Sequence, residues 1–170
     1  METDTEICIK SHIKSVQEKL KVLIEELQQR LKNHDKSKLE KELPFWEAMD
    51  KEPKYTYGTQ EYFEKARRNK MVFEMHYKNN RHHPEHFING VSDMNLIDII
   101  EMLCDWISYK DDISITDAVE IIEEQSERFG FSDELKNLMI NTLFEYFAKL
   151  RMPAELTIHI LGTDIPVSNF

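Results

Sequence analysis

The stretch ICIKSHIKSVQEKLKVLIEELQQRL, residues 7–31, decides the fold class because its apolar side chains recur at helical spacing. The residues that lie three or four positions apart are Ile13, Val16, Leu20, Leu23, Leu27 and Leu31. This spacing predicts one long amphipathic helix whose apolar stripe faces a core. Asn33 and His34 are expected to end the helix, and no glycine or proline interrupts it.

The rest of the chain is also expected to be helical, because it contains only four glycines and five prolines in total. The residues expected to cap five later helices are Ser37, Thr59, Asn95, Thr116 and Ser132. Glu40 would complete a capping box with Ser37. Pro44 would shorten or bend the second helix, and the third would run from Thr59 to about Asn79.

These patterns predict an all-α protein with an HD-domain-like bundle of about six helices. The bundle forms a single domain over residues 1–152, because no linker or low-complexity segment divides it. Residues 153–170 begin with a proline and alternate weakly between apolar and polar side chains. They are expected to form an extended tail or a short strand.

The composition excludes several classes of protein. The net charge of −10 argues against binding a long nucleic acid, whose phosphates require a basic surface. No run approaches the roughly 20 apolar residues that a membrane helix needs. Cys8 and Cys104 are too few for a disulfide framework. Reduced cysteines and a cytoplasmic location are therefore expected.

Five of the seven histidines fall in two short segments. The first segment is His34-Asp35, with Lys38 four residues after the histidine. The histidines of the second segment are His76, His82, His83 and His86. Neutral imidazole nitrogens and anionic carboxylate oxygens together are suitable ligands for a divalent metal ion. The pattern therefore favours a metal-dependent hydrolase.

Carboxylates at helical spacing follow the histidines. Asp98, Glu101 and Asp105 lie on one face of a predicted helix that is otherwise mostly apolar. Such a helix is buried, so its acidic face forms either a narrow solvent-facing strip or the wall of a polar pocket. The histidines favour the pocket, because a buried carboxylate needs a cation beside it.

His12 and His86 are weaker candidates for the same site. An unbroken helix would separate His12 from His34 by about 33 Å, at 1.5 Å per residue. His12 therefore joins the site only if the first segment folds back, and this alternative stays open. His86 is expected to hydrogen-bond to the backbone in a turn.

The order of these residues resembles the HD superfamily of metal-dependent phosphohydrolases. These proteins are all-helical and carry metal ligands in the order His, His-Asp, Asp. His34-Asp35-x-x-Lys38 is similar to the His-Asp-x-Gly-Lys motif of the cyclic-dinucleotide phosphodiesterase branch, with Ser37 in place of the glycine. The later histidines are similar to the additional ligands of that branch, and Asp105 is placed like the closing aspartate.

A closer resemblance covers about residues 9–146. HDKSKLE from His34, HYKNNRHHPEHFINGV from His76 and DMNLIDIIEMLCDW ending at Trp106 are similar to strings in an uncharacterised family of bacteria and their phages. No reaction is established for that family. The resemblance therefore implies a fold and a metal site, but no substrate.

The residues and the resemblance together imply a phosphohydrolase that acts on a nucleotide or another small phosphate ester. The implied metal ligands are His34, Asp35, His76, His82, His83 and Asp105. Lys38 and Arg81 would neutralise charge on the phosphate, and Glu101 would act as a base or orient a histidine. Manganese, magnesium, iron, nickel or cobalt would suit this nitrogen-and-oxygen shell.

Two non-enzymatic alternatives stay open. One is a helical interaction module in which a structural metal or a buried His/Asp network holds the fold. The other is a nucleotide-binding module that sequesters its ligand without turnover. A coordination position open to exchangeable water would favour the enzyme over both. A homodimer is also left open.

Overall fold

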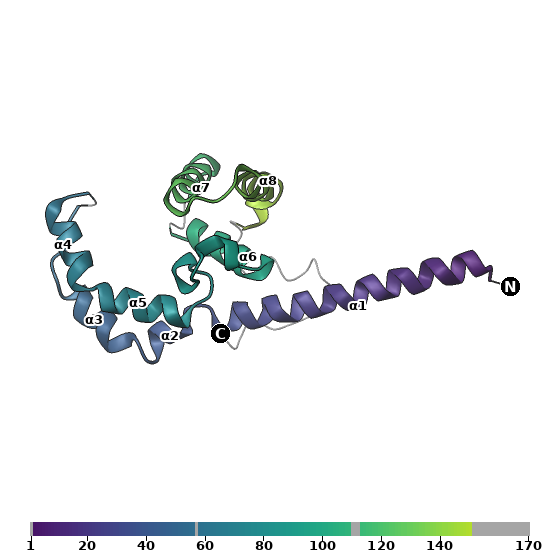
Figure 1. Ribbon diagram of the computed structural model, residues 1–170, viewed down its shortest axis with the longest axis horizontal. Helices are drawn as coiled ribbons and strands as arrows, with labels where there is room; N and C mark the ends of the chain where they lie inside the picture. The colour runs from purple at the N-terminus through teal and green to yellow at the C-terminus, as the bar shows by residue number, and fades with distance from the viewer. Residues whose placement is uncertain (1, 57, 110–112, 151–170) are drawn as a thin grey trace. The chain divides into compact units, whose positions relative to one another are not determined.

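Regular structure in the described residues, 2–56, 58–109 and 113–150, is entirely helical in the computed structural model (Figure 1). The α-helices are α1 (Asp4–Asn33), α2 (Lys36–Leu39), α3 (Leu43–Asp50), α4 (Gln60–Arg68), α5 (Lys70–Asn79), α6 (Leu96–Ile107), α7 (Ile115–Phe129) and α8 (Asp133–Leu150). Two short 3-10 helices, η1 (Pro84–His86) and η2 (Gly90–Asp93), lie between α5 and α6 in the chain. The prediction of an all-α protein is confirmed.

The chain divides into two compact units. The first unit is Met1–Met102, and the second begins at Leu103, within α6. A single domain over residues 1–152 stays a prediction. The predicted tail, residues 153–170, lies outside the described residues. No helix in the described ranges has both the length and the hydrophobicity of a membrane span.

Helix α1 confirms the predicted long helix but not the predicted burial of its stripe. Thr3 begins the helix with a capping box in which Thr3 Oγ1 accepts from the Glu6 amide, and His34 ends it. No residue of α1 is buried, and Ile13, Leu20 and Leu23 are each about half exposed. The expectation of a core-facing stripe is therefore wrong, because no other described element covers this face.

Two predicted helices are each divided in two. The second is divided between Leu39 and Leu43, and Pro44 lies in the first turn of α3, where its missing N–H costs no hydrogen bond. The third is divided at Asn69, which follows α4 and precedes α5 with a non-helical ψ of 11°. These divisions raise the number of separate helices above the predicted six.

Three of the predicted N-caps are confirmed by their hydrogen bonds. Thr59 Oγ1 accepts from the Tyr62 amide at 3.2 Å before α4. Asn95 Oδ1 accepts from the Asp98 amide at 3.0 Å before α6. Ser132 Oγ accepts from the Leu135 amide at 3.3 Å before α8. These side chains satisfy amide groups that have no partner within the helix.

The other two predicted N-caps are wrong. Ser37 lies inside α2, and its hydroxyl accepts from Asn80 instead of capping a helix. Asp35 precedes α2. Helix α7 begins two residues earlier than predicted, because Ser114 forms a capping box with Asp117. Thr116 is therefore within the first turn of α7.

The two units have different interiors. In the second unit, α7 and α8 bury apolar side chains that include Ile122, Met139 and Leu143, all at most 1% exposed. The first unit also buries ionisable groups, because Glu42, His76, His82 and Asp98 are each at most 2% exposed. Charged groups are rarely this buried unless they are paired or coordinate a metal.

The apolar core of the second unit gives a direct stability prediction. Met139→Ala should lower the free energy of unfolding by about 2–5 kcal/mol, because it leaves a cavity where a fully buried side chain packed. Leu138→Ala, at the neighbouring position on α8, should cost less than about 1 kcal/mol because Leu138 is 54% exposed. Urea denaturation measures both, and equal losses would contradict this core.

Candidate metal centre

Four side chains of the first unit meet at one point. Asp35 comes from the junction of α1 and α2, His76 from α5, and His82 and His83 from the turn between α5 and η1. One carboxylate oxygen and three imidazole nitrogens from these residues all lie within 4.8 Å of one another. The structure thus brings together four of the six predicted metal ligands.

The backbone at Asp35 allows neighbouring residues to face the same site. Asp35 has φ of 51° and ψ of 14°, and it is the one non-glycine residue with positive φ in the described chain. Aspartate is among the few residues that tolerate this left-handed conformation. On a continuous helix, His34 and Asp35 would point about 100° apart. The sharp turn after α1 removes this restriction.

The oxygen and nitrogen atoms of the centre are as close to one another as ligand atoms around a single metal ion. Asp35 Oδ1 lies 3.2 Å from His76 Nε2 and 3.5 Å from His82 Nε2. His76 Nε2 lies 2.9 Å from His83 Nε2. His34 also lies near the centre, with its Nε2 atom 3.8 Å from Asp35 Oδ2.

Two glutamates hold the histidines from behind. His76 Nδ1 lies 2.9 Å from Glu42 Oε2, and because a carboxylate oxygen accepts, we assign the ring proton to Nδ1. Glu101 Oε1 accepts from His34 Nδ1 at 3.0 Å and lies 3.2 Å from His82 Nδ1. A histidine that donates through Nδ1 to a carboxylate keeps a lone pair on Nε2, which is the usual arrangement of a metal-ligating imidazole.

Glu42 is fully buried and accepts several hydrogen bonds. Besides His76, its donors include Trp46 Nε1 at 3.1 Å and Asn79 Nδ2 at 2.9 Å. Burial alone would raise the pKa of Glu42, but hydrogen bonds from Ser37, Asn79 and Trp46 lower it to about 2. Glu42 is therefore a carboxylate at neutral pH and stabilises the N–H of His76.

Glu101 is held as an anion in the same way. Burial raises the pKa of its carboxyl group, while hydrogen bonds from His34, His82 and Arg30 hold the pKa well below its usual value. Arg30 Nη1 donates to Glu101 Oε2 at 2.9 Å. The structure thus gives Glu101 the geometry of a residue that orients histidines, one of the two roles suggested by the sequence.

Two atoms in the centre lack ordinary partners. Asp35 Oδ1 and His82 Nε2 are buried, and neither makes a hydrogen bond of good geometry with the described residues. They face each other at 3.5 Å. Leaving a buried polar group unsatisfied costs about 1–3 kcal/mol, and more for a charged group. A cation between the carboxylate oxygen and the imidazole lone pairs would satisfy both atoms.

The predicted cationic residues are engaged with acidic partners. Lys38 Nζ donates to Asp35 Oδ2 at 2.5 Å. Arg81 donates through Nε and Nη2 to the two oxygens of Asp98, at 3.1 and 2.9 Å. Asp98 is fully buried and also pairs with Arg30 Nη2 at 2.9 Å. The roles of Lys38 and Arg81 toward a substrate stay predictions.

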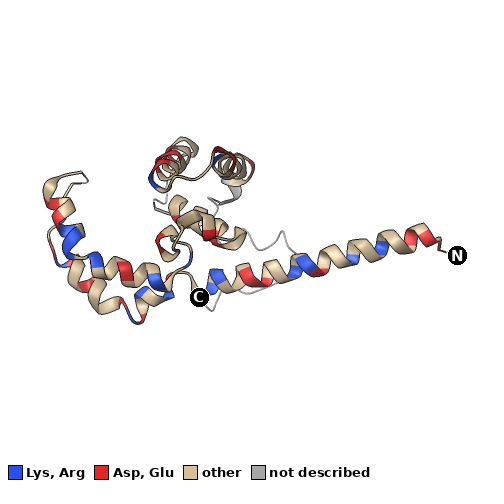
Figure 2. Cartoon of the chain, viewed as in Figure 1, with Lys and Arg blue, Asp and Glu red and all other residues tan. Residues whose placement is uncertain are grey.

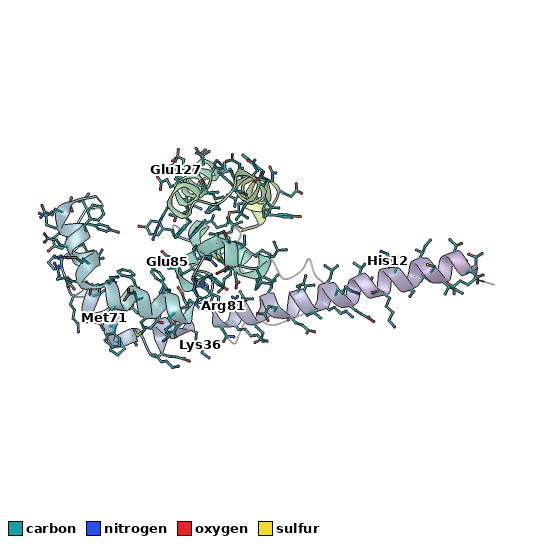
Figure 3. All side chains as sticks on the ribbon, in the orientation of Figure 1. His12, Lys36, Met71, Arg81, Glu85 and Glu127 are labelled. Carbon is teal, nitrogen blue, oxygen red and sulfur yellow. The ribbon has the colours of Figure 1, made fainter. Side chains whose placement is uncertain are left out.

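The remaining predicted residues have separate positions. Asp105 lies one helical turn after Glu101 on α6, so both carboxylates share a face of that helix. Its role as a metal ligand stays a prediction. His86 Nδ1 contacts the Tyr77 carbonyl at 2.9 Å, as expected for a turn histidine. His12 lies on the N-terminal part of the unbroken α1 (Figure 3), about 33 Å from His34 along the helix.

Sequence reasoning missed the residues that support the centre. Glu42 precedes an ordinary apolar segment, and nothing in its neighbourhood marks it as buried. Arg30 appears on the polar side of an amphipathic pattern, yet it joins Asp98 and Glu101. A buried glutamate can be recognised only when the residues that contact it are known. The one feature of the sequence that points to such supporting residues is the number of carboxylates near the histidines.

A family model for a family of unknown function (DUF5662) matches residues 1–145. The chain belongs to this family, as the resemblance of its central strings implied. The family description assigns no reaction. No curated protein and no solved structure matches the chain.

The buried position of Glu42 gives a prediction about stability and pH. Glu42→Gln should lower the free energy of unfolding at pH 7 by about 1–3 kcal/mol, because an amide N–H would face existing donors. The pKa of Glu42 is lowered to about 2 in the folded protein. The difference in unfolding free energy between wild type and variant should therefore have its full size at pH values above the usual pKa of a glutamate. It should disappear as the pH falls toward 2.

The control for this experiment is Glu40→Gln, which alters an exposed glutamate that pairs with Lys36 in a surface contact. Its effect should stay within about 0.5 kcal/mol at each pH. Urea denaturation between pH 2 and 7 measures both variants. A Glu42→Gln difference that is small at pH 7, or that grows as the pH falls, would contradict the account of Glu42.

Proposed function

We propose that this protein is a metal-dependent phosphohydrolase whose ion is held by Asp35, His76, His82 and His83. The observation that carries the proposal is the pair of buried atoms that make no hydrogen bond of good geometry with the described residues, Asp35 Oδ1 and His82 Nε2. They lie beside the nitrogens of two further histidines. In a network held together only by hydrogen bonds, an N–H or O–H donor would lie between the carboxylate oxygen and the imidazole lone pair.

The chemistry of these side chains fits a first-row transition ion. Imidazole nitrogen and carboxylate oxygen suit manganese, iron, cobalt, nickel or zinc, whereas magnesium prefers an all-oxygen shell. Cys8 and Cys104 are both exposed and do not belong to the group formed by Asp35, His76, His82 and His83. The carboxylate of Asp35 would offset part of the cation's charge. Asp105 is a further ligand in this proposal, on the same face of α6 as Glu101.

A bound divalent ion supplies Lewis acidity, which makes water nucleophilic near neutral pH and polarises a phosphoryl group. The side chains of the chain have separate tasks. Glu42 and Glu101 hold the imidazoles so that their Nε2 lone pairs face the centre. Lys38, 38% exposed and next to Asp35, would approach the phosphate and stabilise its developing charge.

A polar cavity lies beside the centre in the first unit. Its volume is about 330 Å³, and its lining includes Arg30, Arg81, His82 and Glu101. Glu26, Asn79 and Asn80 also line it, so guanidinium, amide and carboxylate groups all border the space. The guanidinium and amide groups are suited to a small phosphate-containing substrate. A cavity of this size is at the lower end of small-molecule sites.

The choice of a phosphate ester rests on analogy with the HD superfamily, which an all-helical fold and the His34-Asp35 pair support. The competing proposal is a non-catalytic module in which the same ion holds α1, α5 and the histidine turn together. The two differ in turnover. A structural ion would stabilise the fold without hydrolysis of any phosphate ester.

The first prediction from this proposal concerns metal content. The purified protein should contain close to one transition-metal ion per chain in elemental analysis, and His76→Ala, His82→Ala and Asp35→Asn should each lose most of it. His86→Ala is the matched control, because His86 lies in the same segment and contacts a backbone carbonyl. Asp105→Ala tests the additional ligand.

Circular dichroism should show that the variants retain their helices. A wild-type protein that binds neither manganese, nickel nor cobalt, with its helices intact, would overturn the proposal. The proposal would also be overturned if His82→Ala contained as much metal as the control His86→Ala.

The second prediction concerns turnover. With manganese added, the protein should hydrolyse bis(p-nitrophenyl) phosphate or p-nitrophenyl phosphate, and Lys38→Ala should lower kcat/KM by about 10–1000-fold because charge stabilisation is lost. Metal content should remain unchanged in this variant. Lys36→Ala, at an exposed neighbour in α2, should retain activity. Full metal loading without hydrolysis of these esters or of nucleotides would favour the structural module.

A further inference from the structure

Helix α1 carries an exposed apolar stripe with a strict seven-residue period. The stripe, which we call the α1 stripe, consists of Ile9, Ile13, Val16, Leu20, Leu23 and Leu27. Successive members are alternately four and three residues apart over three heptads. The first five members are 41–53% exposed, and none of the six is buried.

This period indicates the kind of partner that covers the stripe. A straight α-helix has 3.6 residues per turn, so an apolar repeat of 3.5 residues drifts slowly around its surface. The repeat stays in contact with a second helix only if the two helices supercoil around each other. The next two positions of the repeat are Arg30 and His34, which pack in the first unit near Glu101. The same helix face is therefore covered at its C-terminal end and exposed over residues 9–27.

We propose that the α1 stripe pairs with the α1 stripe of a second copy of this chain in an antiparallel two-helix coiled coil. Reversing the helix about residue 18 places Ile9 opposite Leu27, Ile13 opposite Leu23 and Val16 opposite Leu20. Every member of the stripe then meets another member. A self-complementary surface of this kind is what a two-fold symmetric dimer requires.

The charges at the two ends of α1 decide the direction. The first turn carries Asp4 and Glu6, and the last turn carries Arg30 and Lys32. Figure 2 shows acidic residues at the N-terminal end of α1 and basic residues near its C-terminal end. The antiparallel pairing places Asp4 of each copy opposite Lys32 of the other, while Arg30 is engaged with Asp98 and Glu101 of its own chain. A parallel pairing would place like charges together and align the helix dipoles unfavourably.

A segment of the same chain is a poorer match for the stripe. The residues after Leu150 include Pro153 and Pro166, so a helix between these prolines would span fewer than two heptads. The α1 stripe covers three heptads. A second α1 has the required length, period and end charges.

Sedimentation velocity of the full chain tests the dimer. The wild-type protein should sediment at about twice the chain mass of 20.3 kDa at micromolar concentration. The double variant Val16→Glu/Leu20→Glu should sediment as a monomer, because it buries four charges at the centre of the pairing. Ser11→Glu/Gln28→Glu is the matched control, since it adds the same charge at exposed positions outside the stripe. This control should remain dimeric.

A wild-type monomer at every concentration up to about 100 µM, well above typical dissociation constants of specific dimers, would overturn the proposal. That result is also expected if another part of the chain or a different protein covers the stripe. A dimer that persists in Val16→Glu/Leu20→Glu would overturn it too. The circular dichroism spectrum should keep its helical signal in all variants, because the substituted side chains are exposed.

Disulfide trapping tests the direction of the helices. In a Cys8→Ser/Cys104→Ser background, chains with Ile13→Cys are mixed with chains with Leu23→Cys and oxidised by air. Antiparallel pairing predicts that the heterodimer is the main cross-linked product, because these two positions face each other. Predominant Ile13→Cys and Leu23→Cys homodimers would overturn the antiparallel arrangement.

Discussion

The first unit is organised around a buried carboxylate that faces imidazole nitrogens. Asp35 Oδ1 lies within 3.5 Å of Nε2 atoms from His76 and His82, and the Nδ1 atoms of these histidines face Glu42 and Glu101. With the protons on Nδ1, lone pairs face an anionic oxygen. This arrangement is repulsive unless a cation lies between them, and the low dielectric of a protein interior increases the cost.

The surrounding structure is consistent with this constraint. The left-handed backbone at Asp35 turns its carboxylate toward α5, and the hydrogen bonds of Glu42 fix His76. Arg30 links the end of α1 to Asp98 and Glu101 on α6. Each contact joins segments that are distant in sequence, so the unit depends on polar contacts as well as on apolar burial. A metal ion would tie the same segments together.

Most of the helices and the centre of the site could be predicted from the sequence. Periodicity identified α1 and α6, cap residues located the starts of α4, α6 and α8, and residue type identified the histidines and Asp35. Periodicity shows that a helix has an apolar face, but it does not show whether that face meets the same chain. For this reason the pattern of α1 predicts a core contact that the described structure does not provide.

The supporting shell could not be predicted for a different reason. Glu42 is one of many glutamates in an acidic chain, and only its position next to His76, 34 residues later, distinguishes it. Ser37 has the sequence of an N-cap, yet it accepts from Asn80, because the preceding turn at Asp35 begins α2 two residues earlier than predicted. Both cases depend on contacts between distant residues, which local patterns do not contain.

Anomalous X-ray scattering from crystals soaked in manganese tests the central claim most directly, because it locates the ion without depending on activity. The account predicts a strong peak within coordination distance of Asp35 Oδ1 and of the Nε2 atoms of His76 and His82. The absence of a peak at this position in well-ordered crystals, or a peak only at surface carboxylates, would contradict it.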